Sequence, residues 1–220
     1  MDSADRFAEL IQQSPQESHL DLLAGLIGTS FEPAVDVASV VTGLDQLADE
    51  CAPSFDSILA ALFVSRRLRG NRDDYGAPSN SYLHRVLSSG LGIPITLSVC
   101  AIEVGRRLDV PIVGVGLPGH FVIACEGEFA DPFHGGKRYS ADELEPAWQG
   151  VTGMRVALDP RLLQPAHTRS ILLRMLNNLK GTLVAMDDPA MLLTLARLRG
   201  AFPELAPERA EHARWLRHWN

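Results

Sequence analysis

One histidine and one aspartate near the middle of the chain have the residue types and the spacing that suit proton transfer. His120 opens the apolar run HFVIAC and Asp131 closes the run FAD, and the turn EGE between them predicts a β-hairpin. Side chains alternate along a strand, so His120 shares a face with Val122, and a two- or four-residue turn places Val122 opposite Asp131. The imidazole and the carboxylate are then diagonal neighbours. Such an aspartate orients the ring and stabilises the imidazolium, which is the pairing needed to draw a proton from a Cys or Ser nucleophile.

The nucleophile for such a pair belongs at the N-terminus of a helix, and the sequence predicts this helix over 94–108. Pro94 suits a first helical turn, and apolar residues recur at helical spacing from Leu97 to the end of the segment. At a helix N-terminus the macrodipole lowers the pKa of a thiol, and backbone N–H groups stabilise an oxyanion. Gly92, Ile93 and Pro94 occupy this position, and none of them has a nucleophilic side chain. The pair of His120 and Asp131 is therefore predicted to be a vestigial dyad.

Two residues farther along the same helix have nucleophilic groups. Cys100 comes six residues after Pro94, which places it roughly 9 Å along the helix axis and about 240° around it. It is expected to be a packed core thiol, and its use as a nucleophile, with His120 as base and Asp131 as orienting group, stays an alternative. Ser98 lies one turn from Pro94, where a hydroxyl more often bonds to the helix backbone.

The same part of the chain offers a set of metal ligands. His120, Asp131 and His134 are of the residue types that bind zinc. Their spacing matches no specific metal motif, so a metal site is kept as a third alternative. No cofactor is expected.

The surrounding sequence is predicted to be mainly helical. Apolar residues recur near the 3.6-residue period from Asp5 to about Arg69, with Pro and Gly residues as breaks. A loop is expected over 70–79, after which Asn80 is expected to cap a helix over 80–87. The remaining elements predicted from the same patterns are helices over 55–68, 140–151, 168–186, 189–199 and 208–219, and strands over 110–115, 120–125, 129–131 and 156–158.

Composition and charge limit the classes of function. The 220 residues are 46% hydrophobic and carry a formal net charge of −7, which is typical of a globular protein with one good core. Lys and Arg are scattered, which argues against nucleic-acid binding. No apolar run reaches the length of a membrane span, and the N-terminal segment MDSADRFAELIQQ lacks the apolar part of a secretory signal, so a cytoplasmic location is expected. The three cysteines have no paired spacing and predict no disulfide framework. Glu103 is expected to pair with Arg106 or Arg107 at the exposed end of the central helix.

The chain resembles a known bacterial family over residues 60–186. The segments LRGNRDDYGAPSNSYLHRVL, GIPITLSVCAIEVGRRLDVPIVGVGLPGHFV, FADPFHGG and RSILLRMLNNLKG are together similar to the SirB invasion-regulator branch of the transglutaminase-like superfamily. The resemblance implies that His120 and Asp131 match the catalytic histidine and aspartate of active members, that Pro94 stands where their cysteine is, and that the C-terminal tail is tetratricopeptide-like. Two stretches depart from the pattern: SSGL at 88–91 replaces a more basic segment, and RLR at 67–69 stands where the family has Gly-Phe. A partner that depends on the basic segment would be lost or changed here.

Together these features predict an α+β fold with a papain/transglutaminase-like core, in which a central buried helix packs on a small antiparallel sheet. The expected divisions are an N-terminal helical region (1–69), the transglutaminase-like core (70–160) and a C-terminal helical annex (161–220). The expected function is that of a non-catalytic regulatory module that binds a protein or peptide partner, with no nucleic-acid or membrane partner. The alternative is a cysteine-type amidase, peptidase or acyl transferase that uses Cys100 with His120 and Asp131.

Overall fold

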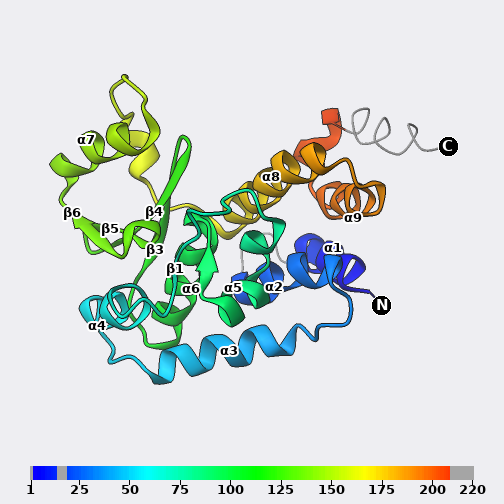
Figure 1. Ribbon diagram of the computed structural model, residues 1–220, viewed down its shortest axis with the longest axis horizontal. Coiled ribbons are helices and arrows are strands. Elements are labelled where there is room, and N and C mark those ends of the chain that lie inside the picture. The colour runs from blue at the N-terminus through cyan, green and yellow to red at the C-terminus, as the bar shows by residue number, and fades with distance from the viewer. Residues whose placement is uncertain (1, 14–18, 209–220) are drawn as a thin grey trace.

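The structure is a computed structural model that describes residues 2–13 and 19–208 (Figure 1). Its helices are α1 (Ser3–Gln13), α2 (Leu20–Phe31), α3 (Ala38–Asp49), α4 (Phe55–Leu59), α5 (Leu83–Ser89), α6 (Pro94–Arg107), α7 (Ala141–Thr152), α8 (Thr168–Met186) and α9 (Pro189–Gly200). Its strands are β1 (Arg69–Gly70), β2 (Leu91–Gly92), β3 (Val113–Leu117), β4 (His120–Cys125), β5 (Glu128–Asp131) and β6 (Lys137–Tyr139). A small antiparallel sheet packs on the central helix α6, which confirms the predicted α+β fold class.

The main sheet joins β3, β4, β5 and β6 in chain order, and each of its faces is covered by a helix. Along β4, Phe121 and Ile123 lie in the main hydrophobic core with α6, whereas Val122 and Ala124 lie in a smaller core with α7. This alternation is the one that the run HFVIAC predicts. Figure 1 shows α7 at the outer edge of the molecule, on the far side of the sheet from most of the helices.

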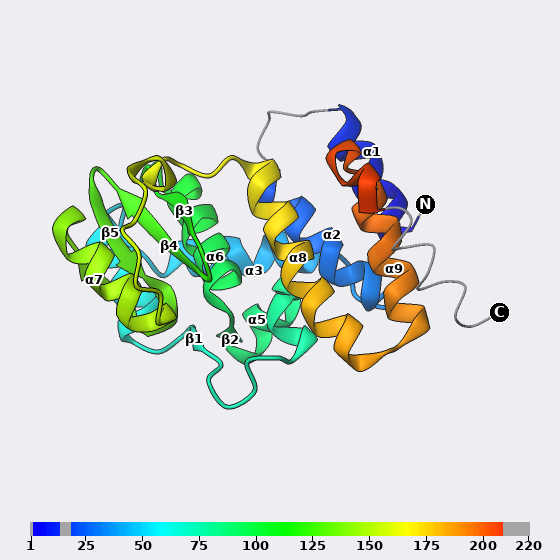
Figure 2. The same ribbon diagram turned by 90° about the horizontal axis from the view of Figure 1, so that it is seen from above.

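Helix α6 is buried along almost its whole length and holds the rest of the fold together. It begins at Pro94, and the hydroxyl of Thr96 closes the first turn by accepting from the Ile93 N–H (3.1 Å) and donating to the Asn80 carbonyl (2.8 Å). The sheet lies on one side of α6, and α2, α3 and α8 contact its other sides (Figure 2). The main core therefore runs from α1 through α6 to α9, and it draws on all three of the predicted divisions.

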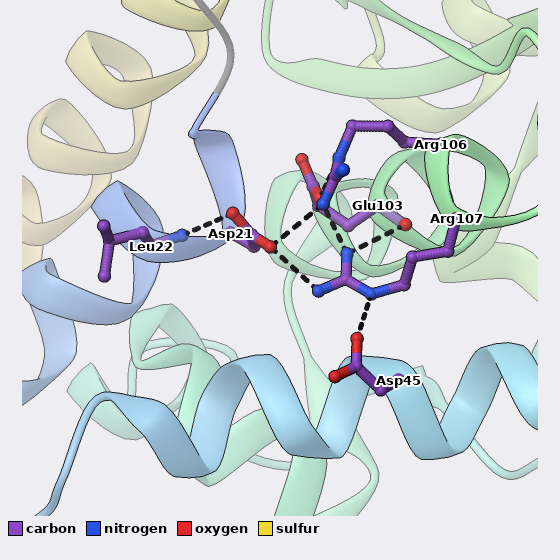
Figure 3. A network of polar contacts seen from close by, with 6 residues as sticks. All are labelled: Asp21, Leu22, Asp45, Glu103, Arg106 and Arg107. Atoms are coloured by element: carbon purple, nitrogen blue, oxygen red, sulfur yellow. Dashed lines mark hydrogen bonds and ion pairs between the residues drawn. The ribbon is translucent and has the colours of Figure 1, made fainter.

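A cluster of charged side chains fixes the C-terminal end of α6 to α2 and α3 (Figure 3). Glu103 accepts from Arg106 (2.8 Å) and Arg107 (2.9 Å), and both guanidinium groups also reach Asp21 of α2. Arg107 continues to Asp45 of α3 (2.6 Å). The predicted pairing of Glu103 is confirmed, but the predicted exposure is wrong, because Glu103 is only 1% exposed. Burial raises the pKa of Glu103, and the nearby carboxylate of Asp21 adds to this effect.

The two helices predicted on either side of the loop over 70–79 differ from the observed ones. The segment predicted as one helix over 55–68 is α4 followed by a π-helical turn, Ala60–Val64, after which Arg66 takes a left-handed conformation (φ 63°). Asn80 does not cap a helix. Its side chain instead donates to two carbonyl groups of the loop (2.7 and 3.1 Å) and accepts from Asn71 (2.9 Å). Asn80 therefore holds the loop closed, and α5 begins three residues later.

Two predicted strands are wrong or shifted because their backbone groups have other partners. The strand predicted over 110–115 is β3, which begins and ends later than predicted. Pro111 has no N–H to donate to a ladder, and the N–H groups on either side of it bond locally. No strand forms over 156–158, because side chains of α7 take its backbone groups: Gln149 donates to one carbonyl and Glu145 accepts from one N–H, each at 2.9 Å.

The predictions for the C-terminal part agree closely with the structure where it is described. Helices over 140–151, 168–186 and 189–199 correspond to α7, α8 and α9 within one residue at each end. The helix predicted over 208–219 lies, apart from its first residue, outside the described residues. No helix in the described part of the chain has the length and apolar character that crossing a bilayer requires.

Candidate functional site

The beginning of β4 and the end of β5 bring His120 and Asp131 together. The antiparallel register of the two strands, joined by the turn Glu126-Gly127, places Asp131 opposite Val122. His120 Nε2 lies 2.7 Å from Asp131 Oδ2, and both side chains are buried. The placement of both residues on one face, predicted from the alternation of side chains along the hairpin, is therefore confirmed, and the structure shows that the two side chains are in contact.

Asp131 is bonded by a second histidine as well. It caps the 3₁₀ turn Pro132–His134, so the backbone N–H of His134 donates to Oδ1 (3.1 Å) and the ring Nδ1 of His134 lies 2.8 Å from Oδ2. Burial by itself would raise the pKa of Asp131. Hydrogen bonds and charges from His120 and His134 outweigh burial and hold the pKa of Asp131 well below its usual range. The result is an ionised carboxylate between two imidazole rings.

The second nitrogen of the His120 ring, Nδ1, has no hydrogen-bond partner among the described residues. Because Nε2 points its proton at the ionised Asp131, a neutral His120 carries its lone pair on Nδ1. This nitrogen can accept a hydrogen bond or a proton from a bound molecule.

A cavity of about 370 Å³ lies against the His120 ring. Pro94, at the N-terminus of α6, lines the same cavity, so the helix end and the dyad meet as the sequence predicts. The other lining residues are Arg72, Tyr75, Gly119, Phe133, His134 and Val151. None of the lining residues is a cysteine, a serine or a threonine. The phenol of Tyr75 is the hydroxyl group among them, and burial raises its pKa, which keeps it protonated.

Neither Cys100 nor Ser98 lines this cavity. Cys100 is fully buried in the main core, and burial, assisted by the charge of Glu103, raises the pKa of its thiol to about 12. The reactive thiolate is therefore strongly disfavoured. Ser98 is also fully buried, and its hydroxyl donates to the Pro94 carbonyl (2.8 Å) as expected for a hydroxyl inside a helix. Cys125 lies in the core with α6, on the face of β4 away from the dyad, as predicted.

The backbone at the dyad is held from α8. The guanidinium of Arg174 donates to the carbonyl groups of Leu117 and His120 and lies over the ring of Phe121 (5.3 Å). The two carbonyl groups flank the tight turn between β3 and β4, where Gly119 adopts φ 68°, a value that favours glycine. Arg174 thus fixes the position of the turn from which the His120 side chain projects.

Three residues of the site are not singled out by the sequence patterns. Phe133 packs edge-on against Tyr75 (5.7 Å between ring centroids), and Arg72 lies over the same ring (5.8 Å). The DPF sequence after the hairpin is a signal for Phe133. Arg72 and Tyr75 lie in the segment LRGNRDDYGAPSNSYLHRVL of the resemblance, but no local pattern assigns them to the site, because their positions depend on the loop that Asn80 closes.

The donor atoms of His120, Asp131 and His134 all lie within 4.8 Å of one another, so these residues could hold a metal ion. Two of the separations, 2.7 and 2.8 Å, are hydrogen-bond distances. Donor atoms around a tetrahedral zinc ion are roughly 3.3 Å apart, given zinc–ligand bonds of about 2.0 to 2.1 Å. The observed distances fit a hydrogen-bonded network better than a metal centre.

Comparison with known proteins identifies the family. The family described as the transglutaminase-like superfamily matches residues 18–177. The chain belongs to the transglutaminase-like superfamily. The matched region of this transglutaminase-like protein begins before α2 and ends within α8, so it contains the N-terminal helices α2 to α5 as well as the sheet and the dyad.

The relatives of this transglutaminase-like chain include bacterial and animal proteins. It is 42% identical over 125 residues to a UPF0162 protein of Xylella fastidiosa, covering 54% of this chain and 44% of that protein. It is 29% identical over 196 residues to a UPF0162 protein of Pseudomonas aeruginosa, covering 80% and 72%. F-box only protein 21 of Mus musculus is 32% identical over 136 residues, covering 56% and 21%. The chain therefore spans less than half the length of the Xylella protein, and no solved structure matches it.

Proposed function

We propose that this transglutaminase-like protein is non-catalytic and that its cleft binds a segment of a protein or peptide in a regulatory role. The observation that supports the proposal most directly is the identity of the residue opposite the dyad, Pro94. Pro94, which has no nucleophilic group, occupies the helix end that lines the His120 cavity. A histidine and aspartate pair activates a nucleophile only if one lies within reach of the ring.

The remaining features of the cleft suit binding. Asp131 fixes the orientation of the His120 ring and leaves Nδ1 available as a hydrogen-bond acceptor for an N–H or O–H group. Phe133 and Tyr75 offer aromatic surface beside it, and Tyr75 is 52% exposed. An apolar wall with a few polar groups of fixed direction is the usual composition of a binding site. The resemblance to the SirB branch, and the helical pair α8 and α9 where a tetratricopeptide-like tail is expected, add to the case for a partner-binding role.

The test is the retention of a partner by cleft variants. The wild-type chain and the variants His120→Ala and Tyr75→Ala are immobilised, and proteins retained from the native host are quantified by mass spectrometry. Val184→Ala, a change at an exposed apolar position on α8, is the matched control. We expect one or more partners to be depleted by both cleft variants and retained by the control. Identical partner sets for all four proteins, with the cleft variants shown to be folded, would contradict the proposal.

The rival function is catalysis by Cys100, and it makes an opposite prediction. A catalytic Cys100 must react with an alkylating agent at neutral pH faster than Cys51 or Cys125, and it must lose this advantage in His120→Ala. The binding function requires no such advantage. The same labelling experiment therefore separates the two hypotheses without knowledge of a substrate.

A further inference from the structure

A second and larger cavity, of about 610 Å³, adjoins the cavity at His120. The two share Arg72, Phe133 and His134 among their lining residues, so they lie next to each other. Arg66 and Arg69 line the larger cavity together with Arg72, and we call the part of this cavity lined by the three arginines the arginine groove. Asp73 is the acidic residue among its lining residues. The groove is therefore cationic in a chain whose formal net charge is −7.

The arginines of the groove have no acidic partners among the described residues. No carboxylate of the described part of the chain lies within ion-pairing distance of Arg66, Arg69 or Arg72, and all three are exposed. Elsewhere exposed arginines such as Arg85 and Arg138 are paired with glutamate. A single solvated arginine is ordinary on a protein surface. Three in one concave site concentrate the positive potential and favour an anionic ligand.

The backbone around the groove has two unusual conformations. The chain reaches the groove through the π-helical turn Ala60–Val64, and Phe63 and Val64 of this turn line it. Arg66 then adopts φ 63°, a conformation that costs free energy for any residue but glycine. Arg69 follows in β1, which is hydrogen-bonded to β2 in parallel. π-Helical turns and left-handed residues of this kind are concentrated at functional sites.

We propose that the arginine groove binds an acidic segment of a peptide or protein, whose anionic groups are side-chain carboxylates or phosphoryl groups. The planar guanidinium groups can bind either anion in a bidentate manner. The segment would continue over Phe133 to the cavity at His120, so the inference rests on the proposed function and names the chemical class of its ligand. In the sequence Arg66, Arg67 and Arg69 suit the solvated C-terminal end of a helix. The fold instead places Arg66 and Arg69, with Arg72, around one cavity.

Fluorescence anisotropy tests the proposal with defined probes. The probes are fluorescein-labelled hexaglutamate, the same peptide with six phosphoserines, hexaglutamine, hexalysine and a single-stranded oligothymidylate. The groove variant is the triple change R66Q/R69Q/R72Q. The matched control is R6Q/R155Q/R161Q, which alters the net charge by the same amount at exposed positions that line neither cavity. Thermal unfolding of both variants checks that the fold is intact.

We expect hexaglutamate or the phosphoserine peptide to bind the wild type and the control more tightly than hexaglutamine does, and hexalysine not to bind. The groove variant should bind the acidic peptide about tenfold or more weakly, because each exposed ion pair changes a dissociation constant by up to about fivefold. The choice between the two acidic peptides identifies carboxylate or phosphoryl as the preferred anion. Binding should weaken with added salt, since the charges are exposed.

Three results would overturn the inference: no preference for the acidic peptides, an equal loss in the groove variant and the charge-matched control, or a preference for the oligothymidylate. These failures are distinct from failure of the proposed function. A partner that depends on His120 but is not displaced by the acidic peptides would retain the proposed function and exclude the acidic ligand. Absence of both kinds of binding would exclude both.

Discussion

The alkylation rate of Cys100 is the sharpest quantitative consequence of the structure. Burial raises the pKa of this thiol from an ordinary 9.0 to about 12. At pH 7.5 a thiol with the ordinary pKa is about 3% thiolate, whereas one with a pKa near 12 is about 0.003% thiolate, a factor of about a thousand. Because only the thiolate attacks iodoacetamide, the pKa alone slows the reaction by this factor, and the complete burial of Cys100 slows it further.

The assay is alkylation with iodoacetamide at pH 7.5, quenched at intervals and followed by peptide mass spectrometry for each cysteine. Cys51 should react first because it is only half-buried, and Cys125 and Cys100 should follow in order of increasing burial. Mild denaturant should accelerate Cys100 most, since its reaction requires opening of the core. The refuting result is a Cys100 that reacts faster than Cys51 in the native protein and that slows in His120→Ala. It would contradict the low reactivity argued from the burial of Cys100, and it would contradict the proposal that the dyad has no nucleophile.

Three further predictions concern stability. Asp131→Asn removes the ionised acceptor of two imidazoles and should lower the free energy of unfolding by about 1–3 kcal/mol at pH 7, as measured by urea titration. The folded-state pKa of Asp131 is depressed, so its stabilising contribution is complete above the ordinary value of 3.8 and is lost as the pH falls below it. In a plot of unfolding free energy against pH, the acid side should therefore be flatter for the Asn variant. Identical acid sides would contradict the depressed pKa of Asp131. The pH dependence of the Glu103 contribution has the opposite sign, because its folded-state pKa is raised: the contribution to stability is greatest below the ordinary value of 4.5 and declines as the pH rises through the folded-state value. Glu103→Gln should abolish this decline. An unchanged dependence of stability on pH in the variant would contradict the prediction. Gly70→Ala should destabilise the protein by about 1–3 kcal/mol, because a Cβ atom there would lie 2.6 Å from the Phe133 ring. The control Gly76→Ala, where a Cβ atom would have nothing within 4 Å, should be nearly neutral. Equal effects of the two changes in urea titration would show that the Phe133 ring moves aside at no cost in stability.

The hairpin and the central helix are predictable from sequence because short-range patterns determine them. Alternation along β4 fixes which side chains share a face, and a two-residue turn fixes the register. The placement of His120 and Asp131 as diagonal neighbours on one face therefore follows without any knowledge of distant residues. The position of Pro94 opposite the dyad is the one that the resemblance to the transglutaminase-like superfamily implies.

The parts that sequence patterns miss depend on contacts between distant residues. Asn80 is a good helix cap by local criteria, but the loop carbonyl groups that it binds compete successfully for its amide. Glu103 has the spacing of an exposed ion pair, and only the packing of α2 and α3 against α6 shows that it is buried. The strand predicted over 156–158 fails because two side chains of α7 take its backbone groups. Apolar periodicity contains no information about any of these partners.

The hydrogen bonds of Arg174 to the turn before β4 have a consequence for shortened forms of the protein. Arg174, which donates to the His120 carbonyl, belongs to α8, more than fifty positions later in the chain. A protein cut before α8 would keep the histidine, the aspartate and the proline, yet the two carbonyl groups of the turn would lose their common donor. The C-terminal helices are thus a structural support of the cleft, and any assay of cleft function calls for a chain that includes them.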